Sequence, residues 1–151
     1  MAMTLFLNTC CLGDCSGISF IDSTTVRVCM NECIHNHKVF KGIDNTGEST
    51  MGWFHGFKLH IIINDKGEIL NLTITQANVN DRQPLKQEHF LDKIYGKLFA
   101  DKGYIRKKLM QMLFVDGVHV ITSVRNNMKN SLMQYTSAEA GPRTVYQRSN
   151  T

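Results

Sequence analysis

The sequence predicts an α/β domain in which helices pack against a mixed β-sheet. Two runs with alternating apolar residues, 53–63 and 68–76, flank a short turn-forming segment, which is typical of a β-hairpin. Further along, short apolar runs alternate with segments of helical periodicity. Antiparallel strands followed by such an alternation indicate a mixed sheet with helices packed on it.

The first strand and the segment after it lie within residues 17–51. Residues 17–28 (GISFIDSTTVRV) combine β-branched and aromatic side chains with alternating apolar positions, and the strand is expected to end near Asp22 to Thr24. Residues 29–51 are rich in polar residues and glycine, which predicts a long irregular connection.

The β-hairpin is the clearest local pattern. Residues 64–67 (Asn-Asp-Lys-Gly) are a strong turn signal between its two strands. Because side chains alternate between the two faces of a strand, Lys58 and His60 should share one face of the first strand. The other face is expected to lie on the core and to carry Phe57, Leu59 and Ile61.

Helices and short strands should alternate in the second half. Asp81 stands where a helix N-cap belongs and Pro84 fits the first turn, so a helix should run to about Tyr95. Residues 97–100 predict a short strand that leads into Asp101. A second, amphipathic helix is indicated by the helical spacing of Ile105, Leu109, Met112 and Leu113.

The end of the chain changes character. Residues 118–122 predict a last strand. The apolar periodicity then fades, and residues 134–151 form a polar stretch with Gly-Pro in the middle. This composition predicts a disordered tail.

Length, composition and charge bound the class of protein. The 151 residues suffice for one domain with a core, and 17 Lys and Arg against 13 Asp and Glu permit a polyanionic partner without requiring one. Neither a bilayer-spanning apolar run nor a cleavable signal pattern is present, so we expect a cytoplasmic protein without a membrane partner. Five cysteines, an odd number, are expected to be reduced thiols.

Four residues that lie close together in the chain support an alternative interpretation, a zinc site. Cys29, Cys33, His35 and His37 are all possible zinc ligands. Structural zinc sites usually use two well-separated pairs of ligands, however, and these four lie close together in the chain. The zinc site is therefore the less favoured interpretation.

Two aspartates stand where metal chemistry could occur. Asp22 (FIDST) and Asp101 (FADKGY) each follow a short apolar strand. If these strands are neighbours, both carboxylates project at one edge of the sheet and offer the hard oxygen ligands that Mg²⁺ prefers. An Asp after a strand is also a common cap or turn residue, so spacing alone leaves both interpretations open.

Five motifs occur in order along the chain: GISFIDST, V-x-K-G, GWFHGFKLHIIINDKGEI, A-N-V-N-D and LFADKGYI. In this order they resemble the bacterial insertion-sequence transposases with a DDE domain, over roughly residues 12–133. The resemblance implies an RNase H-like fold, a mixed sheet with flanking helices that would be incomplete at the C-terminus. Residues 17–133 would be a partial catalytic core, and residues 1–16 the remnant of an N-terminal region.

The resemblance also implies DNA transposition by metal-dependent phosphodiester hydrolysis and strand transfer. Asp22 matches the family's first catalytic acid and Asp101 its second, and both would hold Mg²⁺ or Mn²⁺. Lys58 and His60 match a G-x-K-x-H pattern, and together with Lys102 they are candidates for DNA phosphate contacts. The implied partner is DNA, both element ends and target, and a homodimer is possible.

The family's third acid, a Glu on a downstream helix, has no counterpart in a matching context. After Asp101 the chain contains only Asp116, in a turn, and Glu139, in the polar tail. We therefore expect an inactive fragment of a transposase. The alternatives are a non-catalytic DNA-binding remnant and, less favoured, a small zinc-binding or structural protein.

Overall fold

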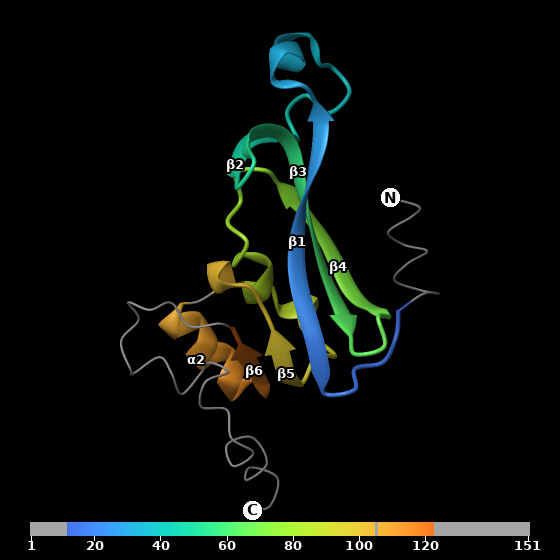
Figure 1. Cartoon of the computed structure of the whole chain (residues 1–151), viewed down its shortest axis with the longest axis vertical. Helices are drawn as coiled ribbons and strands as arrows, with labels where there is room; N and C mark the ends of the chain where they lie inside the picture. The colour runs from blue at the N-terminus through green and yellow to red at the C-terminus, as the bar shows by residue number, and fades with distance from the viewer. Residues whose placement is uncertain (1–11, 105, 123–151) are drawn as a thin grey trace, which may run out of the picture.

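The computed structural model describes residues 12–104 and 106–122 (Figure 1). Within them, six strands form one sheet: β1 (Ile18–Cys29), β2 (Asn45–Ser49), β3 (Gly52–Asn64), β4 (Ile69–Gln76), β5 (Gly96–Phe99) and β6 (Val118–Ile121). The helical elements are η1 (Asn31–Asn36), η2 (Pro84–Lys86), η3 (Glu88–Phe90) and η4 (Lys102–Tyr104), all 3-10 turns, and the α-helix α2 (Lys107–Val115). The predicted α/β class is confirmed, and the architecture is compatible with an RNase H-like fold.

The sheet is mixed and has two parts. Its order is β2-β3-β1-β5-β6, with β4 also paired to β3. β3 runs antiparallel to β1, β2 and β4, whereas β5 runs parallel to both β1 and β6. In Figure 1 the long strands β1, β3 and β4 lie side by side, and α2 lies next to β6. The antiparallel hairpin and the short parallel strands therefore meet at β1.

β1 does not end near Asp22 to Thr24, as predicted, but continues to Cys29. The reason is its partner, because β3 pairs with β1 from Ser19 to Cys29 and satisfies its backbone along that edge. β5 pairs with the other edge of β1 only from Ile18 to Phe20. Beyond Phe20, that second edge of β1 has no strand partner among the described residues.

The segment 29–51 is more regular than predicted. It contains η1 and β2, which pairs antiparallel with the first part of β3. The sequence of β2, NTGES, has no strong strand pattern. It becomes a strand because β4 covers β3 only from Phe57 to Ile63 and leaves the edge at Gly52–Gly56 open.

The hairpin of β3 and β4 is confirmed, but the side of β3 that faces the core is opposite to the prediction. The side chains of His60 and Ile62 are fully buried, at 0% exposure. Phe57, Leu59 and Ile61, which were expected to face the core, are only partly buried. The core forms on the Ile62 face because α2, η2 and η3 all contribute apolar side chains there.

The predicted helix from Asp81 to Tyr95 is wrong. The segment instead forms η2 and η3, with an extended residue, Gln87, between them. A helix would place His89 and Asp92 on the same face as the buried Leu85, yet their side chains are 94% and 60% exposed. The 3-10 turns bury Leu85 without burying these polar neighbours.

The second predicted helix is confirmed as α2, with a different buried stripe. Leu109, Met110 and Leu113 are buried, whereas Met112 is half exposed. The stripe is centred between Leu109 and Met110, which turns Met112 towards solvent. The strands expected at 97–100 and 118–122 are confirmed as β5 and β6.

Some predictions fall outside the described residues. These include Ile105, the tail at 134–151 and most of the segment 1–16. The division of the chain into a remnant, a core at 17–133 and a tail therefore stays a prediction. Among the residues that are described, no helix is long and apolar enough to cross a membrane.

Gly96 is expected to be essential for joining β5 to β1. Its φ is +80°, and an added Cβ would lie 2.4 Å from the carbonyl oxygen of Gly17, which accepts a hydrogen bond from Lys97 N at 2.8 Å. Gly96→Ala should lower the free energy of unfolding by about 1–3 kcal/mol in urea titrations. The matched control is Gly103→Ala, where a Cβ meets nothing within 4 Å. Equal losses in both variants would contradict this account.

Candidate active site

Asp22 and Asp101 emerge from neighbouring strands. The last register pair of β1 and β5 is Phe20 with Phe99, whose rings stack with centroids 5.2 Å apart. Asp22 and Asp101 each stand two residues further along the chain. The two aspartates therefore follow the last paired residues of two neighbouring strands, at the same edge of the sheet.

A pocket of about 350 Å³ opens here because β5 ends while β1 continues. Its walls come from five parts of the chain: β1, the region around the β2–β3 turn, the middle of β3, the loop after β4 and the segment after β5. The lining residues are 22–25, 48–51, Lys58, Asp81, Asp101, Gly103 and Tyr104. The two aspartates predicted from the sequence therefore share one pocket.

Neither Asp22 nor Asp101 is neutralised by a neighbour. No Lys, Arg or His side chain within residues 12–104 and 106–122 forms an ion pair with either carboxylate. Asp22 Oδ1 accepts a hydrogen bond from the backbone N of Ser23 at 2.7 Å, and both aspartates are exposed. Two unpaired carboxylates at one edge favour a bound cation.

Tyr104 places an unusual donor beside these carboxylates. Its side chain is 3% exposed, and among the described residues the hydroxyl has no hydrogen-bond partner within ordinary distance and angle limits, although the Ser23 side chain lies near enough to lower its pKa. Burial raises the pKa of Tyr104 to about 12, and the negative charges of Asp81, Asp22 and Asp101 also raise it. The hydroxyl therefore keeps its proton and offers a donor that lacks an acceptor.

Lys58 and Asp81 form an ion pair in the pocket wall. Lys58 Nζ lies 3.1 Å from Asp81 Oδ1 and donates a second hydrogen bond to the carbonyl oxygen of Val79, also at 3.1 Å. Asp81 is therefore not the predicted helix N-cap. Asp81 was not predicted to line the pocket, although it lies in the A-N-V-N-D motif.

The other two residues predicted to contact DNA are placed differently. Lys102 is exposed and begins η4, directly after Asp101. His60 is fully buried beneath the pocket, and its Nε2 lies 2.9 Å from Thr75 Oγ1. Burial lowers the pKa of His60, and the positive charge of Lys58 lowers it further, while Asp81 opposes this shift. The His60 imidazole is therefore enclosed within the sheet, and its contact with DNA stays a prediction.

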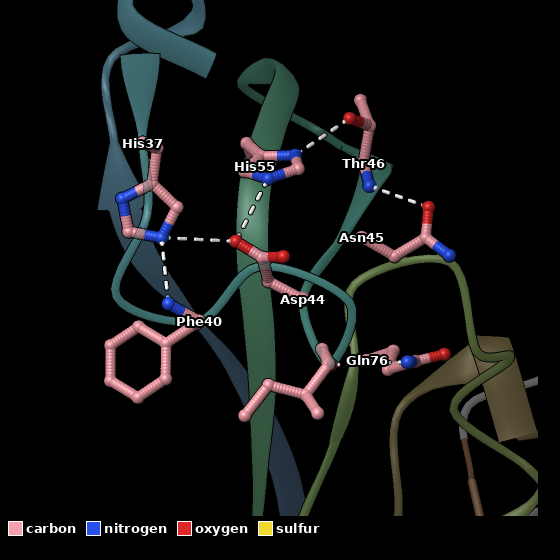
Figure 2. Close-up of polar contacts among 8 residues, drawn as sticks. His37, Phe40, Asp44, Asn45, Thr46, His55 and Gln76 are labelled. Atoms are coloured by element: carbon pink, nitrogen blue, oxygen red, sulfur yellow. Dashed lines mark hydrogen bonds and ion pairs between the residues drawn. The ribbon is translucent and has the colours of Figure 1, made fainter. Parts of the chain in front are cut away.

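The residues of the alternative zinc site do not converge. Figure 2 shows the His37 and His55 rings on either side of the buried Asp44 carboxylate, with Nε2 to Oδ2 distances of 3.2 and 3.0 Å. His55 Nδ1 also lies 2.8 Å from Thr46 Oγ1. Burial raises the pKa of the Cys29 thiol, as do Cys33 and Asp44, which disfavours a thiolate ligand. Within the described ranges, no group of three or more His, Cys, Asp or Glu side chains is arranged to hold a metal ion.

Asp116, the first acid after Asp101, does not line this pocket. Asp116 caps the end of α2 just before β6. Because β5 and β6 are parallel, Asp116 lies at the edge where both strands begin, opposite the edge where Asp101 lies. Glu139 is outside the described residues.

Comparison with known proteins gives one match. A family model described as "Transposase DDE domain" matches residues 12–140. The match covers both aspartates, the Lys58–Asp81 pair and Glu139, and it extends past residue 133, where the resemblance was expected to end. No curated protein and no solved structure matches the chain.

The buried His60 should make the fold sensitive to acid. Above its ordinary pKa of 6.5, His60 is neutral in both folded and unfolded chains. Below pH 6.5 the unfolded chain binds a proton that the folded chain resists, so stability should fall, by at most about 1.4 kcal/mol per pH unit, until the lowered folded pKa is reached. Urea unfolding from about pH 7 to pH 5 should show a smaller decrease for His60→Gln than for wild type.

The control for this comparison is His89→Gln, because the His89 side chain is almost fully exposed. This variant should keep the wild-type dependence on pH. An unchanged dependence in His60→Gln would show that other groups cause the acid sensitivity.

Proposed function

The chain belongs to the transposase DDE domain family, and on this premise we propose that the pocket is the catalytic site for DNA transposition. Transposases act on DNA, and DDE transposases generally use a divalent metal. In the proposed site, Asp22 and Asp101 are the ligands of Mg²⁺ or Mn²⁺. The observation that carries the proposal is the Phe20–Phe99 register, which brings both carboxylates to one edge of one pocket.

The donor set fits a hard divalent cation. Two carboxylates without an ion-pair partner supply oxygen ligands and negative charge. The unpartnered hydroxyl of Tyr104 lies within their electrostatic influence and can hold one of these carboxylates in place. When bound, such ions activate a water or a 3′-hydroxyl and stabilise charge on the phosphate oxygens.

Two cationic side chains, Lys58 and Lys102, are candidates to contact the phosphates of the DNA backbone. Lys58 presents its ammonium inside the pocket, and Lys102 stands exposed next to Asp101. Both can approach phosphate oxygens, which position DNA without reading its sequence. His60 belongs to the support of this site, since its bond to Thr75 links β3 to β4 below Lys58.

We further propose that the 151-residue chain by itself does not complete the reaction. Among the described residues, Asp22, Asp101 and Glu48 line the pocket without an ion-pair partner. Glu48 comes from β2, ahead of Asp101 in the chain, so it is not the downstream Glu that the resemblance implies, and Asp116 lies at the opposite edge. Transfer of a phosphoryl group requires accurately placed charges, and a missing ligand lowers the rate by large factors. A DNA-binding protein without cleavage activity would then remain.

Metal binding is expected to be weak and to depend on both aspartates. Calorimetric titration with Mg²⁺, or line broadening by Mn²⁺ in NMR spectra, should detect it. Asp22→Asn and Asp101→Asn should each lower the affinity about tenfold or more. Asp92→Asn, which changes an exposed carboxylate outside the pocket, is the control and should bind as wild type does. Equal binding by all four proteins would refute the assignment.

No cleavage is expected from the chain of 151 residues. The assay uses supercoiled plasmid carrying the ends of the element, with Mn²⁺ as the more permissive ion. Nicking or cutting that disappears in both Asp101→Asn and Glu139→Gln would show that Glu139 supplies the third carboxylate. The proposed inactivity would then be wrong.

A further inference from the structure

The Lys58–Asp81 ion pair is more enclosed than a surface ion pair. The Lys58 side chain is 13% exposed, and both of its hydrogen-bond acceptors belong to the loop after β4. Lys58 itself lies in the middle of β3, opposite Thr25 of β1. The loop after β4 therefore fixes the ammonium end of Lys58, while β3 holds its backbone in the sheet.

The ammonium retains one donor for a ligand. A lysine ammonium has three N–H donors, and two of them are used by Asp81 Oδ1 and the Val79 carbonyl oxygen. No third acceptor contacts Nζ among the residues that the structure describes. Because Lys58 lines the pocket, the third donor is available to an acceptor there.

Fixing this side chain has a definite consequence for binding. A free lysine side chain samples many rotamers, and part of this rotamer entropy is lost whenever a ligand immobilises the ammonium. Asp81 and Val79 remove much of that freedom before any ligand arrives. The ammonium is therefore already oriented for an anionic oxygen in the pocket.

We propose that Asp81 is a positioning residue, which orients the Lys58 ammonium towards a phosphate oxygen of DNA bound beside Asp22 and Asp101. The inference rests on the proposed function, since it takes DNA as the ligand of this pocket. It gives an acidic residue a favourable role in binding a polyanion. If Asp81 acted only by repelling the negatively charged DNA, its removal would strengthen DNA binding. The two accounts therefore predict opposite changes in DNA affinity for Asp81→Asn.

The test is DNA binding without divalent metal, so that it does not depend on occupancy of the proposed metal site. Fluorescence anisotropy with a short fluorescein-labelled DNA duplex in EDTA, over a series of salt concentrations, gives the affinity and its salt dependence. Lys58→Met should weaken binding several-fold and reduce the slope of log K against log salt by about 1. Asp81→Asn should also weaken binding, and the double variant should be no weaker than Lys58→Met.

Tighter binding by Asp81→Asn would overturn the inference, because removal of a repelling charge would then be its main effect. Asp81→Glu keeps the negative charge and provides a second test if the Asp81→Asn variant does not fold. It should bind a few-fold more weakly than wild type, since a longer side chain moves the ammonium, and wild-type affinity would count against positioning. Asp92→Asn is the control for loss of one acid outside the pocket. If the wild-type chain does not bind DNA, the proposed function fails together with the inference.

Discussion

The unequal pairing of β1 determines the rest of the structure. Its edge against β3 is paired from Ser19 to Cys29, whereas its edge against β5 is paired for only three residues. The first pairing keeps β1 extended past Asp22, and the second ends just before the two aspartates. A pocket results because the neighbouring strand ends while β1 continues.

The pocket contains both paired and unpaired carboxylates. Asp22 and Asp101 have no cationic partner, while Asp81 is paired with Lys58. A cation bound in the pocket would be attracted by both unpaired carboxylates. Asp81 acts differently, because Lys58 already offsets its charge. Its proposed contribution is to hold the Lys58 ammonium in one position. Three aspartates in one pocket thus have two distinct roles, set by their neighbours.

The buried polar contacts away from the pocket have a structural role. Asp44 joins His37, in the connection after η1, to His55 on β3, and His55 also contacts Thr46 on β2 (Figure 2). These contacts attach a long, mostly exposed segment to the sheet. Of the four residues in the less favoured zinc interpretation, only His37 contacts Asp44, and it shares that carboxylate with His55, which is outside the set.

The sequence by itself predicted the fold class, the β3–β4 hairpin and the short strands β5 and β6. It also singled out Asp22 and Asp101 as candidate site residues. These predictions were possible because alternation, turn chemistry and motifs are local properties of the sequence. Only the tertiary structure decided which face of β3 is buried, since alternation defines two faces without saying which one meets α2. It likewise decided that residues 81–95 turn twice without forming a helix, because Leu85 must reach the core while His89 stays in water. The pairing of Asp81 with Lys58 joins residues 23 positions apart, and a contact of that range exists only once β3 and β4 are side by side.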